Sequence, residues 1–117
     1  DRPLMEPMHL SSFEHPPEVS EVDELGLATE PSTLVKTPRL AVAPIAMECR
    51  LRHCIEFGET RSRLLVGEVV MFHVRDGLLV NGKIDTKALD PICRLGGPRY
   101  ATLGEIVTMQ PVPQTRK

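Results

Sequence analysis

The alternation of apolar and polar side chains marks two stretches near the middle of the chain as β-strands. Over residues 45–57, apolar side chains fall mainly at odd-numbered positions and charged ones at even-numbered positions. This period of two is typical of a strand with one buried face. Over residues 64–74, apolar side chains occupy both parities, as in a strand covered on both faces. We therefore expect residues 64–74 to lie inside a sheet.

A short polar linker, residues 58–62, joins the two stretches and predicts an antiparallel hairpin. A register centred on Thr60 places apolar side chains together on one face and opposite charges together on the other. The expected cross-strand pairs are Arg52 with Glu68, His53 with Gly67, Leu51 with Val69, and Cys49 with Met71. A slip of one residue would turn the charged side chains inward.

The first third of the chain is rich in proline, with seven of the 11 prolines in residues 1–44. This density opposes a long helix and favours an extended, turning segment. One short helix is expected between Ser20, a good N-cap residue, and Gly26. Residues 33–36 and 39–42 should form short extended pieces.

Turn signals divide the remainder into short elements. The pair Asn81-Gly82 favours a tight hairpin turn, and Asp85 can cap a helical turn over residues 86–89. Residues 92–95 and 100–109 predict the last two strands, with a glycine-containing loop between them.

These elements predict a β-rich, antiparallel fold of four to six strands with one or two short helices. We expect a proline-rich connecting segment with a short helix over residues 1–44, sheet strands over residues 45–110, and a tail over residues 111–117. A length of 117 residues with 41% hydrophobic and 26% charged side chains suits a single folded domain.

The composition argues against several partners. Three phenylalanines, one tyrosine, no tryptophan and a net charge of −2 suit neither base stacking nor a phosphate backbone, so no nucleic-acid partner is expected. The sequence has no long apolar run and no signal-peptide pattern, so we expect no membrane partner and a cytoplasmic location. Three cysteines without C-x-x-C spacing indicate neither a disulfide framework nor a metal site.

The best candidate for ligand contact is the loop that begins at Arg94. Gly96 and Gly97 allow backbone amides to approach a ligand closely. Arg94 and Arg99 can hold a phosphate or a carbonyl oxygen, and Tyr100 combines a flat apolar ring with a polar tip. The alternative is a tight turn between two strands with solvated arginines.

The four histidines carry weaker signals. His53 interrupts an apolar face and is expected as a core histidine, with a role near a cofactor or substrate as the alternative. His73 should lie at the surface. His9 and His15 lie among prolines without other ligands at metal-site spacing, so no metal is expected.

Several segments together resemble the flavin reductase-like family in their order and spacing. They are Glu48-Cys49-Arg50-Leu51, Val66-Gly67-Glu68-Val69-Val70 with His73, Asp85 to Leu89, Arg94-Leu95-Gly96-Gly97 with Tyr100, and Leu103-Gly104-Glu105. Members of that family are FMN-binding split barrels. The resemblance therefore implies an antiparallel, Greek-key-like split β-barrel.

The resemblance also implies an activity. It suggests an FMN-dependent oxidoreductase that transfers hydride from NAD(P)H to FMN and onward to an acceptor, with the flavin at a homodimer interface. The residues of this chain expected at that pocket are Arg94, Gly96, Gly97, Arg99 and Tyr100, with Ser11 and Ser12 from an upstream segment. No catalytic residue is assigned, because the flavin itself carries the hydride chemistry.

Family members are usually nearly twice as long as this chain, and nothing here resembles their N-terminal half. We therefore expect a C-terminal portion of the barrel, left incomplete by the absent strands. The alternative is a non-catalytic β-barrel fragment or assembly module that binds no cofactor.

Overall fold

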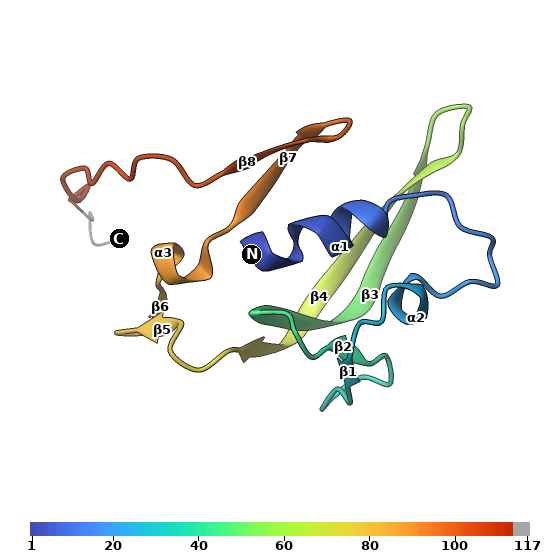
Figure 1. Cartoon of the computed structure of the whole chain (residues 1–117), viewed down its shortest axis with the longest axis horizontal. Coiled ribbons are helices and arrows are strands. Elements are labelled where there is room, and N and C mark those ends of the chain that lie inside the picture. The colour runs from blue at the N-terminus through green and yellow to red at the C-terminus, as the bar shows by residue number, and fades with distance from the viewer. Residues whose placement is uncertain (114–117) are drawn as a thin grey trace.

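The computed structural model describes residues 1–113, so residues 114–117 of the expected tail lie outside the described residues. Within them, the chain forms four separate two-stranded antiparallel ribbons (Figure 1). The strands are β1 (Thr29–Glu30), β2 (Arg39–Leu40), β3 (Ile45–Phe57), β4 (Ser62–Val74), β5 (Leu79–Val80), β6 (Lys83–Ile84), β7 (Ile92–Gly96) and β8 (Arg99–Thr102). The helices are the 3-10 turn η1 (Arg2–Leu4), α1 (Met5–Leu10), α2 (Glu21–Glu24) and α3 (Thr86–Leu89).

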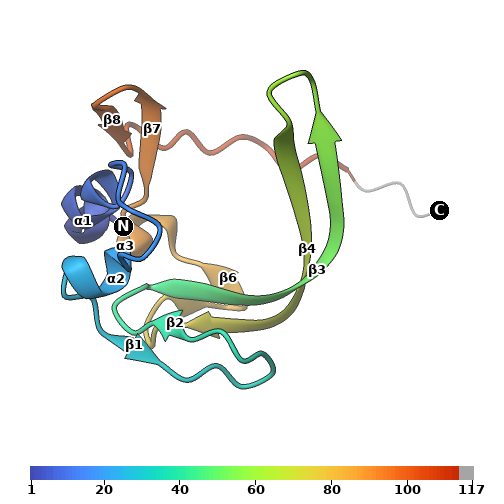
Figure 2. The ribbon, with the colours of Figure 1, turned by 90° about the vertical axis from the view of Figure 1, so that its right-hand side faces the viewer.

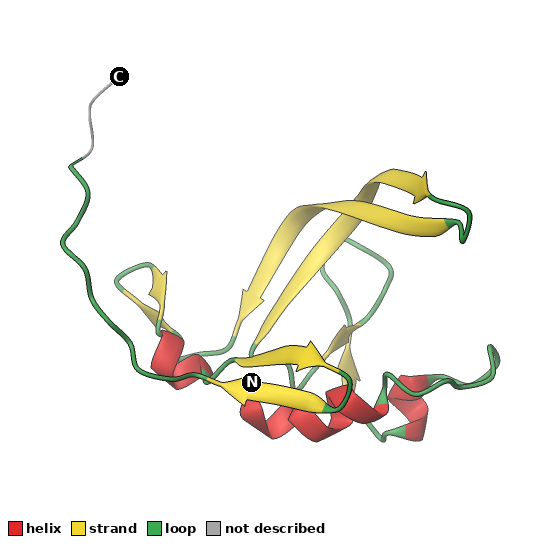
Figure 3. Cartoon of the chain, turned by 90° about the horizontal axis from the view of Figure 1, so that it is seen from above, coloured by secondary structure: helices red, strands yellow, loops and turns green. Residues whose placement is uncertain are grey.

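The β-rich, antiparallel character is confirmed, although the strands outnumber the expected four to six and are short outside β3 and β4. The base of the long β3–β4 ribbon lies beside α2, and its far half bends away from α1 and α2 (Figures 2 and 3). The predicted bounds of β3 are confirmed, but the last strand ends at Thr102 and does not continue to Met109.

The predicted register of the hairpin is wrong by one residue or more. The observed pairs are Glu48 with Met71, Cys49 with Val69, Arg50 with Glu68, Leu51 with Gly67, and His53 with Val66. Irregularities between Glu48 and Cys49 and between Leu51 and His53 shift the register twice. Such bulges add a residue to one strand and cannot be read from a simple alternation. The side chain of Arg52 still forms an ion pair with Glu68.

The second irregularity moves apolar side chains to the other face of the ribbon. Directly opposed residues share a face, and consecutive residues of a strand point to opposite faces. Leu51 opposes Gly67 and His53 opposes the neighbouring Val66, so Leu51 and His53 lie on different faces. Ile55 therefore lies on the opposite face from Leu51, and both faces of the ribbon carry apolar side chains.

These faces are uncovered within residues 1–113. Strand β4 pairs only with β3 there, so the expectation of an interior strand is wrong for the described chain. The exposed fraction is 66% for Leu51, 64% for Leu65 and 60% for Phe72. The accessible surface is 10063 Å², whereas a compact 13.0 kDa protein exposes about 6,300 Å². The radius of gyration is 17.7 Å, against about 13 Å for a compact chain of this length.

The short helices and turns follow their local signals. The Ser20 side chain accepts a hydrogen bond from the Asp23 amide at the start of α2. Asp85 accepts from two amides at the start of α3. Asn81 and Gly82, between β5 and β6, both have positive φ, 52° and 73°, as the predicted tight turn requires.

Helix α1 is the main element that the sequence analysis did not predict, because proline is frequent in this segment. Pro7 lies in its first turn, where an amide hydrogen has no helical acceptor and proline is tolerated. Pro3 lies in η1, directly before α1. The segment was expected to be extended and turning apart from the short helix after Ser20, and this expectation was wrong for Met5–Leu10.

The buried carboxylate of Glu48 holds a neighbouring loop against β3. Only 1% of its side chain is exposed, and it accepts hydrogen bonds from the amides of Thr33 (2.7 Å), Leu34 (2.6 Å) and Val35 (3.2 Å). The Nε2 atom of His73 lies 2.6 Å from Oε1 of Glu48. The prediction that residues 33–36 are extended was wrong, because this segment bends so that its amides reach the Glu48 carboxylate. His73, predicted at the surface, is partly buried, since 24% of its side chain remains exposed beside Glu48.

The pKa of Glu48 is lowered from its ordinary value of 4.5 to about 2. Burial by itself raises this pKa, but hydrogen bonds from the Thr33 amide, the His73 ring, and the Leu34 and Val35 amides outweigh the effect. A group whose pKa is lower in the folded state stabilises the fold above its unfolded pKa. The contribution of Glu48 is therefore complete above about pH 4.5 and is lost as the pH falls towards 2.

Replacing the carboxylate by an amide tests this assignment. We expect Glu48→Gln to lower the melting temperature at pH 7 by several degrees, because an amide is a weaker acceptor and leaves an unpaired donor against the loop amides. The variant should also lose less additional stability between pH 5 and pH 2 than the wild type does. Thermal unfolding followed by circular dichroism at several pH values measures both effects.

The matched control is Glu68→Gln, which breaks the exposed ion pair with Arg52 and should change stability little. Parallel loss of stability with falling pH in the wild type and Glu48→Gln would contradict the assignment.

Candidate functional site

The loop predicted to contact a ligand is the turn of the β7–β8 ribbon. Gly96 and Gly97 form this turn with φ values of 111° and 55°, a left-handed backbone that favours glycine. Arg94 pairs directly with Tyr100 across the ribbon, and Gly96 pairs with Arg99. The turn therefore presents two arginines and one aromatic ring within a few residues of each other.

Both arginines are exposed. Within residues 1–113, neither Arg94 nor Arg99 forms an ion pair, unlike Arg2, Arg39 and Arg75. Their guanidinium groups keep their hydrogen-bond donors available for an anion.

Tyr100 is held by a residue that the sequence did not indicate. Its hydroxyl oxygen lies 3.0 Å from Nδ1 of His9, in α1. The two rings meet edge to face with centroids 5.6 Å apart, and the ring of Phe13 meets His9 in the same way at 5.4 Å. These contacts join the N-terminal helix to the last strand, across 91 positions of sequence.

Ser11 and Ser12 lie at the C-terminal end of the same helix. The Ser11 hydroxyl donates to the carbonyl of Met8 at 2.9 Å, and the Ser12 hydroxyl donates to the carbonyl of His9 at 2.7 Å. Both hydroxyl hydrogens are therefore used to close the helix end, and each oxygen can still accept a further bond.

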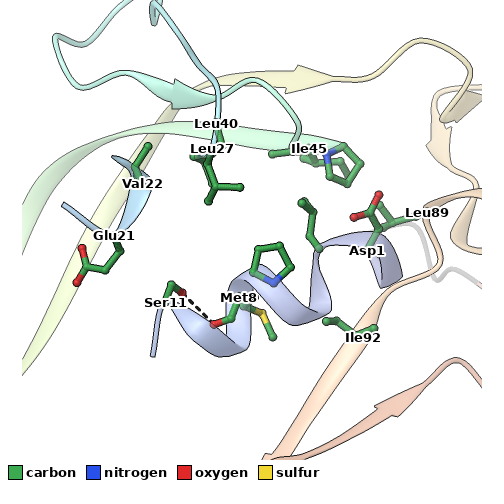
Figure 4. Close-up of a pocket in the computed structure, with 14 residues that line it drawn as sticks. Asp1, Met8, Ser11, Glu21, Val22, Leu27, Leu40, Ile45, Leu89 and Ile92 are labelled. Carbon is green, nitrogen blue, oxygen red and sulfur yellow. Dashed lines mark hydrogen bonds between the residues drawn. The ribbon is translucent and has the colours of Figure 1, made fainter. Parts of the chain in front are cut away.

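An apolar cavity of about 510 Å³ lies between α1, α2 and the start of β3. Figure 4 shows the side chains that surround it. The cavity is lined by Asp1, Leu4, Pro7, Met8, Ser11, Glu21, Val22, Leu27, Leu40, Ala43, Pro44, Ile45, Leu89 and Ile92. A mostly apolar cavity of this size with a few polar groups at its edge is typical of small-molecule sites.

Helix α1 therefore contacts two different parts of the structure, the cavity and β8. Leu4, Met8 and Ser11 follow helical spacing and line the cavity. His9 points to β8 instead. Tyr100 therefore lies on one side of α1 and the cavity-lining Ser11 on the other, with Ser12 at the end of the same helix.

Other predicted features are placed elsewhere. His53 is exposed on β3, so the expectation of a core histidine was wrong, because the face on which it lies has no cover here. Within residues 1–113, no cluster of three or more potential metal ligands occurs. No helix in that range has the length and apolar character needed to span a membrane.

His9 is the residue of this region that the sequence analysis missed. A signal was present, since Leu4, Met8 and Ser11 have the spacing of a helix face. The surrounding prolines outweighed that signal. The partner of His9 could not be inferred, because no local pattern connects it with Tyr100.

Comparison with known proteins identifies relatives that match most of the chain. The family model of the flavin reductase like domain matches residues 6–88. An uncharacterised protein of Halalkalibacterium halodurans, BH2278, is 39% identical over 113 residues, which cover 93% of this chain and 54% of that protein. The chain thus spans about half the length of the curated relative that it matches.

Solved structures agree with this assignment. Nitrilotriacetate monooxygenase component B from Bacillus cereus is 34% identical, with a TM-score of 0.87, over 93% of this chain and 56% of that one. A Shewanella frigidimarina protein with a split barrel domain is 20% identical, with a TM-score of 0.83, over 96% of this chain and 57% of that one.

The second similarity concerns the fold alone, and it identifies the open ribbons as strands of a split barrel. The ribbons do not close on one another within residues 1–113, in agreement with the expected incomplete barrel. The family match covers well over half of the 117 residues, and the chain belongs to the flavin reductase-like family.

Proposed function

We propose that this chain contributes to an FMN site of an NAD(P)H-dependent oxidoreductase, in which FMN takes hydride from NAD(P)H and passes electrons to an acceptor. The observation that carries the proposal is the β7–β8 turn, where two exposed arginines that form no ion pair within residues 1–113 lie near a tyrosine anchored by α1. Family membership supports a flavin as the ligand. The chain spans about half of its relatives, so the activity is proposed for the whole protein.

The arginines would bind the phosphate of FMN. Arg94 is directly opposite Tyr100 and shares its face, whereas Arg99 precedes Tyr100 in β8 and points to the other face beside the turn. A phosphate at the end of the turn would lie between the two guanidinium groups, which form paired hydrogen bonds with phosphate oxygens. At Gly96 and Gly97 no side chain shields the backbone, so the main chain can approach the ligand. The residues present therefore fit a phosphate-bearing ligand.

The isoalloxazine ring would lie beside Tyr100 and the end of α1. An aromatic ring packs favourably against a flat heterocycle, and Ser11 and Ser12 keep acceptor oxygens for its polar edge. When bound, FMN supplies the hydride chemistry. The residues of this chain bind and orient it.

A second copy of the chain would cover one of the two bare faces of the β3–β4 ribbon. The accessible surface exceeds the compact value by about 3,700 Å², and a stable interface needs only about 800 Å² from each partner. The exposed side chains of the β3–β4 ribbon include many apolar ones, as in obligate dimer interfaces. A non-catalytic assembly module would share this property, and flavin titration separates the two functions.

The phosphate contacts can be tested with two ligands that differ only there. We expect Arg94→Ala/Arg99→Ala to weaken FMN binding by at least about tenfold, because charged hydrogen bonds to the phosphate are lost. Riboflavin, which has no phosphate, should bind the variant and the wild type within about threefold of each other. Quenching of flavin fluorescence measures both affinities.

The matched control is Arg61→Ala at the tip of the β3–β4 ribbon, where the side chain is 82% exposed. It should leave both affinities unchanged. Equal losses for FMN and riboflavin in the double variant, or no flavin binding by the wild type, would contradict the proposal.

Association through the β3–β4 ribbon can be tested on one of its faces. The wild type should have about twice the 13.0 kDa mass of the chain by light scattering. Leu51→Glu/Leu65→Glu should shift it to the mass of one chain, because charges in an apolar interface are strongly unfavourable. Arg61→Glu is the control outside this face, and a wild type of single-chain mass would refute the dimer.

A further inference from the structure

We propose that His9 is a positioning residue that fixes the Tyr100 ring for the flavin. This inference rests on the proposed function, and it assigns a role to a residue outside the predicted ligand contacts. Among residues 1–113, His9 to Tyr100 is the one side-chain hydrogen bond between α1 and the β7–β8 ribbon. The pair therefore joins the two parts of the proposed site.

The imidazole of His9 is itself held in place from two sides. The rings of Phe13 and Tyr100 contact it edge to face, with interplanar angles of 82° and 87°. The backbone carbonyl of His9 accepts bonds from the amide and the hydroxyl of Ser12, at 3.1 Å and 2.7 Å. The contact with Phe13 restricts the imidazole rotamer, and Ser12 closes the turn of backbone that carries His9, so His9 can direct Tyr100.

The hydrogen bond restricts Tyr100 in turn. A tyrosine ring bound only at its Cβ can rotate, and ordering it when a ligand binds lowers affinity. With its hydroxyl bonded to Nδ1 of His9, the ring is ordered before the ligand arrives. Arg94, which is proposed to bind the phosphate, lies directly opposite Tyr100. The hydrogen bond to His9 therefore fixes the tyrosine ring beside that arginine.

The arrangement also assigns an indirect role to Ser12. Its hydroxyl closes the turn that carries His9, so it acts through the helix end and not only as a ligand contact. Ser11 lines the cavity on the other face of α1 and does not contact His9 through its hydroxyl.

The test is a double-mutant cycle of His9→Phe and Tyr100→Phe. Each change keeps an aromatic ring and removes one partner of the hydrogen bond. We expect each single variant to weaken FMN binding about three- to tenfold and the double variant to bind no more weakly than either single variant, since residues that act as a pair are not additive. His9→Asn, whose amide can reach the position of Nδ1, should recover most of the affinity.

A second readout needs no flavin. Tyr100 is the only tyrosine and the chain has no tryptophan, so the near-ultraviolet absorbance band reports on Tyr100. His9→Phe should shift this band in the free protein, and His9→Asn should restore it. Phe13→Leu changes the packing of His9 without removing a hydrogen-bonding group, so it should leave the band in place.

The outcomes separate the two proposals. An unshifted tyrosine band in His9→Phe, or losses of affinity that add in the double variant, would overturn the role of His9 while leaving the flavin site intact. A shifted band together with no FMN binding by the wild type would overturn the proposed function and, with it, the positioning role. Circular dichroism of each variant verifies folding.

Discussion

The pairing of β3 with β4 organises the described chain. It joins two strands of 13 residues each, and the Arg75 amide continues it by donating to the carbonyl of Pro44. It also brings His73 of β4 against Glu48 of β3. Glu48 then holds the loop after β1 through three amides. The ribbon thus fixes the loop and side chains at its base. Its own faces remain bare, as expected for strands of an incomplete barrel.

This arrangement explains which parts of the fold could be predicted from the sequence. The bounds of β3, the caps at Ser20 and Asp85, and the turn at Asn81-Gly82 depend on neighbours a few residues away. Local chemistry determines them, so the sequence pattern is sufficient. The burial of Glu48 depends on a loop 13 to 15 positions away, and a strand pattern alone assigns that carboxylate to a polar face.

The register shows a second limit. Two bulges shift the pairing, and a bulge depends on twist and on packing across the ribbon. The ion pair between Arg52 and Glu68 was expected and is present, yet their backbones are not directly opposite. A correct side-chain contact therefore does not establish a register, because long charged side chains reach diagonal neighbours.

Part of the candidate site could likewise be predicted from the sequence, and part could not. Adjacent glycines and flanking arginines made the β7–β8 turn visible in the sequence. The link from Tyr100 to His9 spans 91 positions and was hidden, as was the helix that carries His9. The helix end with Ser11 and Ser12 is connected to the turn only by a tertiary contact, which a sequence pattern does not reveal.

The proposed FMN site lies between the β7–β8 turn and the end of α1. A crystal structure of the protein soaked with FMN tests it most directly. We expect the phosphate within hydrogen-bonding distance of Arg94 or Arg99 and the isoalloxazine ring against Tyr100. FMN bound with its phosphate away from both arginines and its ring away from Tyr100 would contradict the claim.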